Sequence, residues 1–471
     1  MNALTRDLKQ LVELAEKAAP AGGHFRQKIH LMPPTGWLND PNGLCQFKGL
    51  FHAFFQYSPF NPEGGVKMWG HCTSRDMVHW EYQGTALYPD QPFDCHGAYS
   101  GCALVEDGRM YLYYTGNVKL EDREYDYVLA GREGNTVLVE SEDGFSMGRK
   151  QLLMRNEDYP ADLSCHVRDP KVWKQDGRYY MIQGVRTKED VGEAQIFVSG
   201  DRLSWSPLKR IRTEEPFGYM WECPDYMDVD GQKLLSASVQ GLEGDKWRDQ
   251  NVYQSGYFYI KGDILGEYSL SEYQLWDCGF DFYAPQSFVT EDGRVVLVAW
   301  MGMPDCPEYG NEPALAEGWQ HCFTFPREIF IRDGAVRQRP VRELEKLKRK
   351  VKEAQDRLEA ECPSAWEADI TGIQGGAFRA VLGGGLALTY TGSRFEMRFE
   401  GPEGEKISGG RRLRYQEMKS LDSVKILGDA SSVEVFVNSG EYVFTTRYYP
   451  ETRTLEAEAD GAEISLYSVE L

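Results

Sequence analysis

The chain has 471 residues, enough for two or three domains around a large buried core. Its 73 Asp and Glu residues outnumber its 52 Lys and Arg residues, and the formal net charge of −21 argues against binding to nucleic acid or an anionic membrane through a general positive field. We therefore expect a small, neutral ligand and no nucleic-acid or membrane partner. Aromatic side chains make up 13% of the chain, which suits β-structure and flat, ring-shaped ligands. The sequence does not indicate an oligomeric state.

Residues 1–23 form the first predicted element, a helical extension. Leu4, Leu8, Leu11 and Ala15 recur at helical spacing among charged residues, so we expect an amphipathic helix and not a signal peptide. No apolar run approaches the roughly 20 residues of a membrane span. The ten cysteines include no Cys-x-x-Cys pair, and free thiols predict a cytoplasmic protein. The eight histidines include no His-Glu-x-x-His motif, so we expect neither a metal nor a cofactor.

Residues 24–340 contain a repeated hairpin pattern. Turn dipeptides that end in glycine recur about 60 residues apart, and an aromatic or aliphatic run follows each of them. The glycines are Gly49, Gly108, Gly177, Gly231 and Gly293. Because no helix-period segment separates these five β-units, they predict a five-bladed β-propeller in preference to a parallel α/β sheet.

A second repeat supports the same architecture. The pattern Ser-x-Asp-x-x-x-Trp occupies residues 74–80 and 199–205, and a degenerate copy ending in methionine occupies residues 141–147. We interpret it as a recurrent turn beside a buried ring, because a turn that is repeated around a fold is structural.

The residues upstream of the hairpins carry the functional signal. Alignment of the five units on their turn glycines brings one position, eight or nine residues earlier, into register. This position holds Asp40, Ser100, Asp169, Glu222 and Ala284. If the units are blades, three acids converge at one mouth of the central channel, where mutual repulsion would raise the pKa of at least one. Stability alone gives no reason for such an arrangement.

The pattern changes after the fifth unit. Leu344, Leu347, Val351, Ala354 and Leu358 have helical spacing among charged residues, which predicts a linker helix over residues 341–361. Residues 362–471 then alternate in the manner of strands around Asn-Ser-Gly at 438–440, which predicts a C-terminal β-sandwich. The predicted fold class is therefore all-β.

Eight short motifs, in order along the chain, carry a resemblance to a known family. They are WLNDPNG (37–43), WGH (69–71), YSG (99–101), RDP (168–170), ECP (222–224), DFYAPQSF (281–288), FPRE (325–328) and SSVEVFVNSGE (431–441). The chain from residue 30 to its end resembles glycoside hydrolase family 32, the invertase and sucrose-6-phosphate hydrolase group. The family fold is a five-bladed propeller followed by a β-sandwich, which agrees with the repeat count reached from the turns.

The resemblance implies roles for the three acids. Asp40 would be the nucleophile, Glu222 the general acid/base, and Asp169 would hold fructose hydroxyls and stabilise the transition state. Cleavage of a fructosyl bond passes through an oxocarbenium-like state, so one carboxylate must face the anomeric carbon while a proton donor reaches the leaving oxygen. Retention requires a covalent fructosyl-enzyme that water then hydrolyses. Glu222 must begin protonated, and its apolar neighbours and the two other acids favour this.

The same comparison implies a set of substrate-binding residues. They are Asn39, Gln56, Tyr99, Ser100 and Arg168 as sugar contacts, with Trp69 and Trp300 as ring-facing walls. Each has an alternative. The tryptophans could be propeller core, Ser100 could cap a neighbouring strand, and Arg168 could simply neutralise Asp169.

The resemblance implies a β-fructofuranoside as substrate, either sucrose, its 6-phosphate or a short fructo-oligosaccharide. Two departures leave the leaving group open: Tyr99 replaces a frequent phenylalanine, and the loop 61–65 lacks a tryptophan that many members carry. A fructosyltransferase on the same scaffold is an alternative activity. A non-catalytic glycan-binding propeller is a third, but it predicts a missing carboxylate, and all three acids are present.

Overall fold

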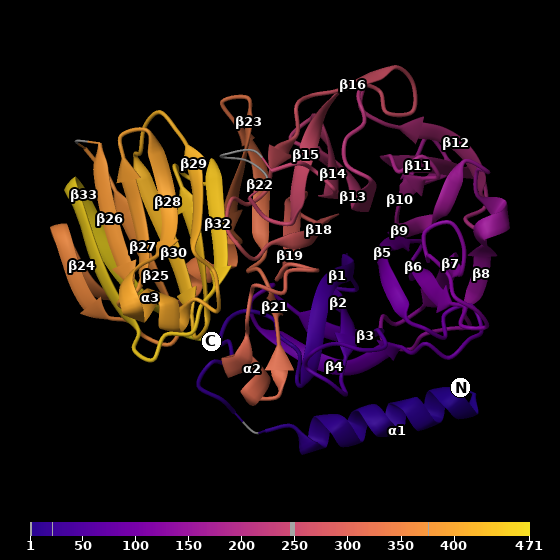
Figure 1. Cartoon of the computed structure of the whole chain (residues 1–471), viewed down its shortest axis with the longest axis horizontal. Coiled ribbons are helices and arrows are strands. Elements are labelled where there is room, and N and C mark those ends of the chain that lie inside the picture. The colour runs from indigo at the N-terminus through magenta and orange to yellow at the C-terminus, as the bar shows by residue number, and fades with distance from the viewer. Residues whose placement is uncertain (1, 21, 245–249, 375) are drawn as a thin grey trace.

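The computed structural model describes residues 2–20, 22–244, 250–374 and 376–471. An N-terminal helix, a propeller and a sandwich follow one another along the chain (Figure 1). Helix α1 (Ala3–Ala18) confirms the predicted extension and lies along the outside of the first blade. Glu16 anchors it, because its carboxylate accepts hydrogen bonds from Tyr82 at 2.6 Å and Tyr57 at 3.2 Å. In the described ranges, no helix combines the length and apolar character that a membrane crossing requires.

The propeller has five blades, as predicted. Blade 1 contains β1 (Gly36–Phe47), β2 (Leu50–Ser58), β3 (Met68–Ser74), β4 (Trp80–Leu87) and β20 (Trp319–Gln320). Blade 2 contains β5 (Ala98–Glu106), β6 (Arg109–Lys119), β7 (Arg132–Ser141) and β8 (Gln151–Met154). Blade 3 contains β9 (Leu163–Gln175), β10 (Arg178–Thr187), β11 (Gly192–Ser199) and β12 (Ser206–Ile211).

The other two blades complete the ring. Blade 4 contains β13 (Met220–Val229), β14 (Gln232–Gln240), β15 (Tyr253–Gly262), β16 (Tyr268–Leu270) and β17 (Gln274–Leu275). Blade 5 contains β18 (Tyr283–Val289), β19 (Val295–Met301), β21 (Cys322–Phe323), β22 (Arg327–Arg332) and β23 (Ala335–Pro340). The short helices η1 (Asn156–Asp158) and α2 (Glu312–Ala316) lie in connections. Strands β1, β5, β9, β13 and β18 contact one another in that order around the axis.

The turns that predicted the blades have the expected conformation. Gly49 has φ of 77°, and a Cβ atom there would meet nothing within 4 Å. Glycine is therefore favoured by the left-handed backbone conformation and not by a lack of room for a side chain. The Ser-x-Asp repeat is also structural. Asp76 accepts hydrogen bonds from the backbone amides of Val78 and His79. In blade 3, Asp201 accepts from the equivalent amides of Leu203 and Ser204.

The predicted linker helix over residues 341–361 is wrong. A 3₁₀ helix, η2 (Arg342–Leu347), leads into strand β24 (Lys348–Glu361). This strand pairs with β33 (Thr454–Val469) along its length, from Lys348 opposite Val469 to Glu361 opposite Thr454. The ladder of hydrogen bonds outweighs the local helix propensity of the charged residues. The sandwich therefore begins at Lys348, earlier than the predicted boundary at 362.

The C-terminal sandwich is confirmed, and one long strand joins its two layers. The remaining strands are β25 (Trp366–Thr371), β26 (Ala377–Leu382), β27 (Leu386–Thr391), β28 (Arg394–Phe399), β29 (Leu413–Glu417), β30 (Ser423–Asp429), β31 (Ser432–Val437) and β32 (Tyr442–Arg447), with helix α3 (Gly401–Ile407) between β28 and β29. Strand β33 pairs with β26 through residues 455–459 and with β25 through residues 463–468. Apolar side chains from both layers form the core between them.

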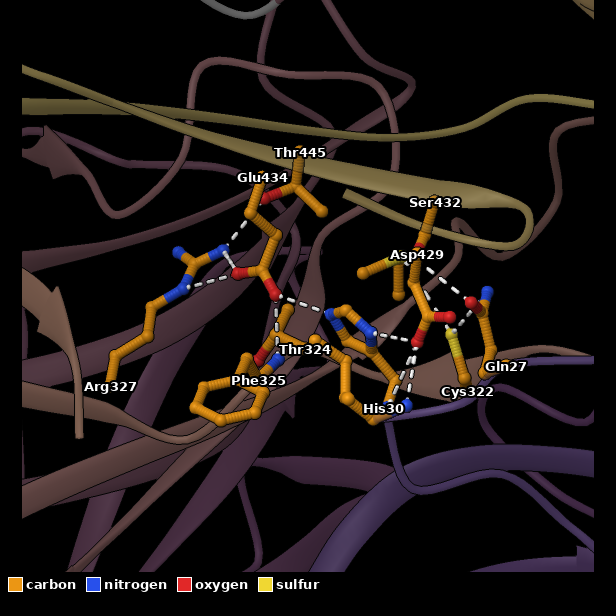
Figure 2. A network of polar contacts seen from close by, with 12 residues as sticks. Gln27, His30, Cys322, Thr324, Phe325, Arg327, Asp429, Ser432, Glu434 and Thr445 are labelled. Atoms are coloured by element: carbon orange, nitrogen blue, oxygen red, sulfur yellow. Dashed lines mark hydrogen bonds and ion pairs between the residues drawn. The ribbon is translucent and has the colours of Figure 1, made fainter. Parts of the chain in front are cut away.

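A buried network of charged side chains holds the sandwich on the propeller (Figure 2). The His30 ring lies between Asp429, 2.8 Å from Nδ1, and Glu434, 2.9 Å from Nε2. Arg327 of blade 5 also donates to Glu434, from Nε at 2.8 Å. Burial would lower the pKa of His30, but the two carboxylates raise it to about 9. Because these side chains are fully buried, loss of one partner would leave an uncompensated charge.

Candidate active site

A β-bulge interrupts every inner strand at the same height and shapes the mouth of the channel. In each case two residues lack a partner on the second strand of the blade. They are residues 39–40, 99–100, 169–170, 223–224 and 284–285. Three of these residues, Asp169, Cys223 and Ala284, have positive φ of 62°, 47° and 49°. Bulges redirect side chains, so the fold aims these residues along the channel instead of into the blade.

The bulges correct the alignment made on the turn glycines. A proline follows the shared position in four blades, at 41, 170, 224 and 285. Counted from this proline, Asp40 and Asp169 are equivalent, whereas Glu222 stands one residue earlier, in register with Arg168 and Tyr283. The three acids therefore occupy two successive positions and not one: Asp40 and Asp169 lie within the bulges, whereas Glu222 pairs with Ser238 just before the bulge of its strand. The structure still brings them together, because Asp169 accepts a hydrogen bond from the Cys223 amide at 3.0 Å and the Cys223 thiol lies 3.8 Å from Asp40.

Asp40 is held by hydrogen bonds from three predicted site residues. Ser100 donates to its Oδ2 at 2.5 Å, Gln56 donates to the same oxygen at 3.2 Å, and Asn39 donates to Oδ1 at 3.0 Å. Burial raises the pKa of Asp40, the bonds from Ser100 and Asn39 lower it, and the nearby charge of Glu222 raises it again. These donors fix the carboxylate and favour its ionised form, which is the form that can attack carbon.

Glu222 has a separate partner for each carboxylate oxygen. Arg168 donates to Oε1 from Nε at 3.1 Å and from Nη2 at 2.6 Å. Oε2 accepts from Gln240 at 2.9 Å and from the Tyr283 hydroxyl at 2.6 Å. Burial and the charge of Glu222 raise the pKa of Tyr283 well above its usual value, so its hydroxyl keeps the proton that it donates. The orientation of Glu222 is thus fixed from both sides.

Asp169 is the most buried of the three acids, with an exposed fraction of 7%. Its backbone amide donates to Thr115 at 2.9 Å, and its carboxylate lies 3.9 Å from Arg168. Burial raises the pKa of Asp169, and the charges of Glu222 and Asp40 add to this, whereas Arg168 opposes it. Burial, and after it the charges of neighbouring acids, thus raises the pKa of Asp40 and of Asp169.

The predicted ring walls differ in their surroundings. Trp69 is fully buried between Phe54 and Tyr114, and its Nε1 donates to the Tyr99 carbonyl at 3.0 Å. It therefore supports the backbone beside Ser100 and exposes no face to a sugar, as in the alternative reading of a core residue. Trp300 is also buried, with an exposed fraction of 3%, and together with Trp37 it lines a cavity of about 450 Å³ that none of the three acids lines.

Motif reasoning missed three residues that contact the acids or their neighbours. Tyr283 lies in the DFYAPQSF motif, and alignment on the prolines would have placed it beside Glu222. Gln240 ends strand β14 and gives no signal of its own in the sequence. Trp37 opens WLNDPNG, and its Nε1 donates to Asn39 at 2.8 Å.

This arrangement suits the cleavage of a glycosidic bond. One carboxylate, Asp40, is fixed by neutral donors, while a second, Glu222, is bonded to Arg168 and Tyr283 on the neighbouring side of the mouth. Such a pair can supply a nucleophile and a proton donor to one acetal carbon.

Comparison with known proteins gives one consistent result. The model of the glycosyl hydrolases family 32 N-terminal domain matches residues 30–340, and the model of the family 32 C terminal matches residues 407–470. The chain is 38% identical to a sucrose-6-phosphate hydrolase of Bacillus subtilis, over 95% of this chain and 93% of the relative. It is 36% identical to a raffinose invertase of Escherichia coli, over 98% of this chain and 97% of the relative.

Solved structures agree with the sequence relatives. The sucrose-6-phosphate hydrolase of Lactobacillus gasseri superposes with a TM-score of 0.87 at 28% identity, and the match covers 98% of this chain and 96% of that one. A β-fructofuranosidase mutant of Bombyx mori in complex with sucrose superposes with a TM-score of 0.83 at 27% identity, and the match covers 100% of this chain and 99% of that one.

Proposed function

The chain belongs to glycoside hydrolase family 32 and is a β-fructofuranosidase that hydrolyses sucrose-type substrates, and we propose that it acts with retention, with Asp40 as nucleophile and Glu222 as general acid/base. The observation that carries the proposal is the contrast between the two carboxylates. Asp40 is held by neutral donors close to Cys223, whereas Glu222 faces Arg168 and Tyr283.

In the first step, Asp40 attacks the anomeric carbon of the fructosyl unit while Glu222 gives its proton to the glycosidic oxygen. The bond to the leaving glucosyl unit breaks, and an ester forms between Asp40 and fructose. In the second step, Glu222 takes a proton from water, which attacks the same carbon and releases fructose with Asp40 restored. Tyr283 and Arg168 hold the Glu222 carboxyl in place during both transfers.

Asp169 binds fructose and stabilises the transition state in this proposal. Its raised pKa reflects burial beside two other acids, and sugar hydroxyls would add hydrogen-bond donors to the Cys223 amide that already bonds it. Asn39, Gln56, Tyr99 and Ser100 complete the fructose contacts. Trp300 forms an apolar wall beside Trp37.

The stereochemistry of the product tests the proposal. NMR of freshly formed product should show the β-anomer of fructose first, followed by mutarotation. If α-fructose formed first, the reaction would be inverting, and Asp40 would have to activate a water molecule instead of forming a bond to carbon.

We also propose a cytoplasmic location. All ten cysteines are free thiols, and most of them are buried, which fits a reducing compartment. Labelling of the thiols in intact cells, with and without prior oxidation, would test this.

A further inference from the structure

Two cations of blade 2 have no carboxylate partner in the part of the chain that the structure describes. Lys119 ends strand β6, Arg132 begins strand β7, and the two residues lie opposite each other in the ladder between these strands. Opposed residues of an antiparallel pair are neighbours on one face of the sheet. Among the described residues, neither side chain forms an ion pair with a carboxylate: Nζ of Lys119 lies 5.6 Å from the centroid of the Tyr127 ring, and Nε of Arg132 is buried without a hydrogen-bond partner. This is unusual in a chain of net charge −21.

A chain of contacts links the pair to Glu222. Lys119 lies over the Tyr127 ring, and the Tyr127 carbonyl accepts a hydrogen bond from His166. His166 in turn accepts from Arg168, which donates to Glu222. Burial and the charge of Arg168 lower the pKa of Arg132, whereas the charges of Tyr99 and Glu222 oppose this. Burial and the charge of Arg132 lower the pKa of Lys119. The cluster is thus a set of mutually repelling cations at the mouth of the channel, beside Glu222.

A neighbouring histidine keeps these charges unneutralised. Burial and the charges of Arg168 and Arg132 keep the pKa of His166 far below its usual value, at about 2, so its ring is neutral. Its Nδ1 accepts from Arg168 at 2.5 Å, and its Nε2 donates to the Tyr127 carbonyl at 2.9 Å. His166 therefore contacts Arg168 without contributing charge of its own. A stable fold gains nothing from this repulsion, which an anionic ligand would relieve.

The position of the cluster identifies which part of a substrate it would meet. Glu222 must reach the glycosidic oxygen, so the leaving glucosyl unit lies on the Glu222 side of the cleft. A different cation, Lys67, acts on Asp40 and lies over the Trp37 ring with Nζ 4.7 Å from the ring centroid. Arg132 and Lys119 therefore face the leaving group and not the fructosyl unit.

We propose that Arg132 and Lys119 form an anion subsite that binds the phosphate of a 6-phosphorylated glucosyl leaving group. This rests on the proposed function, because the side of the cleft is assigned through the role of Glu222. A guanidinium presents paired N–H donors that match a phosphate, and an ammonium adds a second charge. The subsite makes sucrose 6-phosphate a better substrate than sucrose, and it binds the product glucose 6-phosphate through the same contacts.

The selectivity of matched variants tests the subsite. We would measure kcat/KM for sucrose 6-phosphate and for sucrose at one ionic strength, and compare the ratio of the two. A variant that disturbs the carboxylates changes kcat/KM for both substrates by a similar factor, so this effect cancels in the ratio. Arg132→Gln should lower the ratio about tenfold or more, because a hydrogen bond to a charged group is worth about 1.5–3 kcal/mol. Lys119→Gln should lower it less, and the double variant should bring the preference close to one.

Two control variants make the result decisive. Arg109→Gln removes an arginine from the other end of strand β6, where it pairs with Glu140 and Glu142, and should leave the ratio within about twofold. Lys67→Gln removes the cation beside Asp40. If Lys67→Gln lowered the ratio and Arg132→Gln did not, the phosphate would lie on the Asp40 side and the assignment would be overturned.

Product inhibition separates a sugar-phosphate site from a site for free anions. Glucose 6-phosphate should inhibit sucrose hydrolysis more strongly than either glucose or inorganic phosphate, and Arg132→Gln should abolish the difference. If inorganic phosphate alone inhibited as strongly as glucose 6-phosphate, the site would be a free-anion site and the inference would be wrong. If sucrose were cleaved with retention while the ratio stayed unchanged in every variant, the subsite would fail and the proposed function would stand.

Discussion

Arg168 donates two hydrogen bonds to one oxygen of Glu222, and the other oxygen accepts from Tyr283 and Gln240. Arg168 also lies 3.9 Å from Asp169, so one guanidinium connects two of the three acids across adjacent blades. The RDP motif therefore supplies both an acid and the cation that positions the acid of the next blade.

Replacement of Arg168 should damage catalysis more than binding. We expect Arg168→Gln to lower kcat/KM for sucrose by about a hundredfold or more, because Glu222 loses its fixed orientation and two buried acids lose their shared cation. Steady-state kinetics would measure this. Arg178→Gln, on the exposed start of strand β10, is the matched control and should retain nearly full activity. Comparable losses in both variants would contradict the role of Arg168.

The roles proposed for Asp40 and Glu222 predict different responses to the leaving group. Asp40→Ala should lose nearly all activity on every fructoside, because no covalent intermediate can form. Glu222→Ala should lose about 10²–10⁴-fold on sucrose, but far less on an aryl fructoside whose leaving group needs no proton. The ratio of rates on the two substrates is the measurement. If Asp40→Ala recovered with the aryl fructoside and Glu222→Ala did not, the two roles would be exchanged.

We expect Tyr283 to position Glu222 without contacting the substrate. Its hydroxyl donates to Glu222 at 2.6 Å, and its raised pKa keeps that proton in place at any pH of interest. We expect Tyr283→Phe to lower kcat by about tenfold, the effect of one hydrogen bond to a charged group, with little change in KM. The ring should still pack against Trp300, so thermal stability should be nearly unchanged. A loss confined to KM would place the hydroxyl on the sugar instead.

Much of this site could be predicted from the sequence, for identifiable reasons. The turn glycines report backbone conformation directly, so the number of blades and the convergence of Asp40, Asp169 and Glu222 followed from their spacing. Trp69 shows the limit: a motif names the residue but does not tell whether its ring faces the cleft or the core. Strand β24 shows another, because its partner β33 lies about a hundred residues later and overrides a local helical pattern.

The cationic cluster could not be read from the sequence for the same reason. Lys119 and Arg132 lie on either side of a loop and are brought opposite each other by strand pairing, and Arg168 comes from the next blade. No short motif holds all three. The net charge of the chain is negative and gives no indication of a local cluster of cations.

The raised pKa of Asp169 predicts that replacing this residue stabilises the folded protein while it removes activity. An acid whose pKa is raised on folding destabilises the folded state once pH exceeds the pKa of the unfolded chain, since the buried charge then costs free energy. Asp169→Asn should therefore raise the melting temperature of the ligand-free protein by about 2 °C or more at pH 8, and by less at pH 4. It should also lose nearly all activity. Calorimetry at the two pH values would check this, and equal shifts at both would contradict it.

The buried contact between His30 and the sandwich predicts the alkaline limit of stability. Asp429 and Glu434 raise the pKa of His30 to about 9, above its usual 6.5. A histidine whose pKa is raised on folding stabilises the fold fully below its unfolded pKa, and this stabilisation is lost as pH rises through the folded value. Stability should therefore fall progressively between about pH 6.5 and pH 9.

The lowered pKa values of Asp429 and Glu434 predict a corresponding loss of stability at acidic pH. Their contribution is present above the unfolded pKa of a carboxyl and is lost as pH falls through the lower folded values, so the network is strongest from about pH 5 to pH 6.5. His30→Gln should lower stability at pH 6 and flatten the decline from pH 6.5 to 9, because the titrating group is gone while the interface stays filled. His79→Gln is the matched control, since His79 pairs with Asp76 at the exposed surface. Denaturant unfolding of the three proteins at pH 6, 7.5 and 9 would measure this. If wild type and His30→Gln declined in parallel, the alkaline limit would arise elsewhere in the molecule.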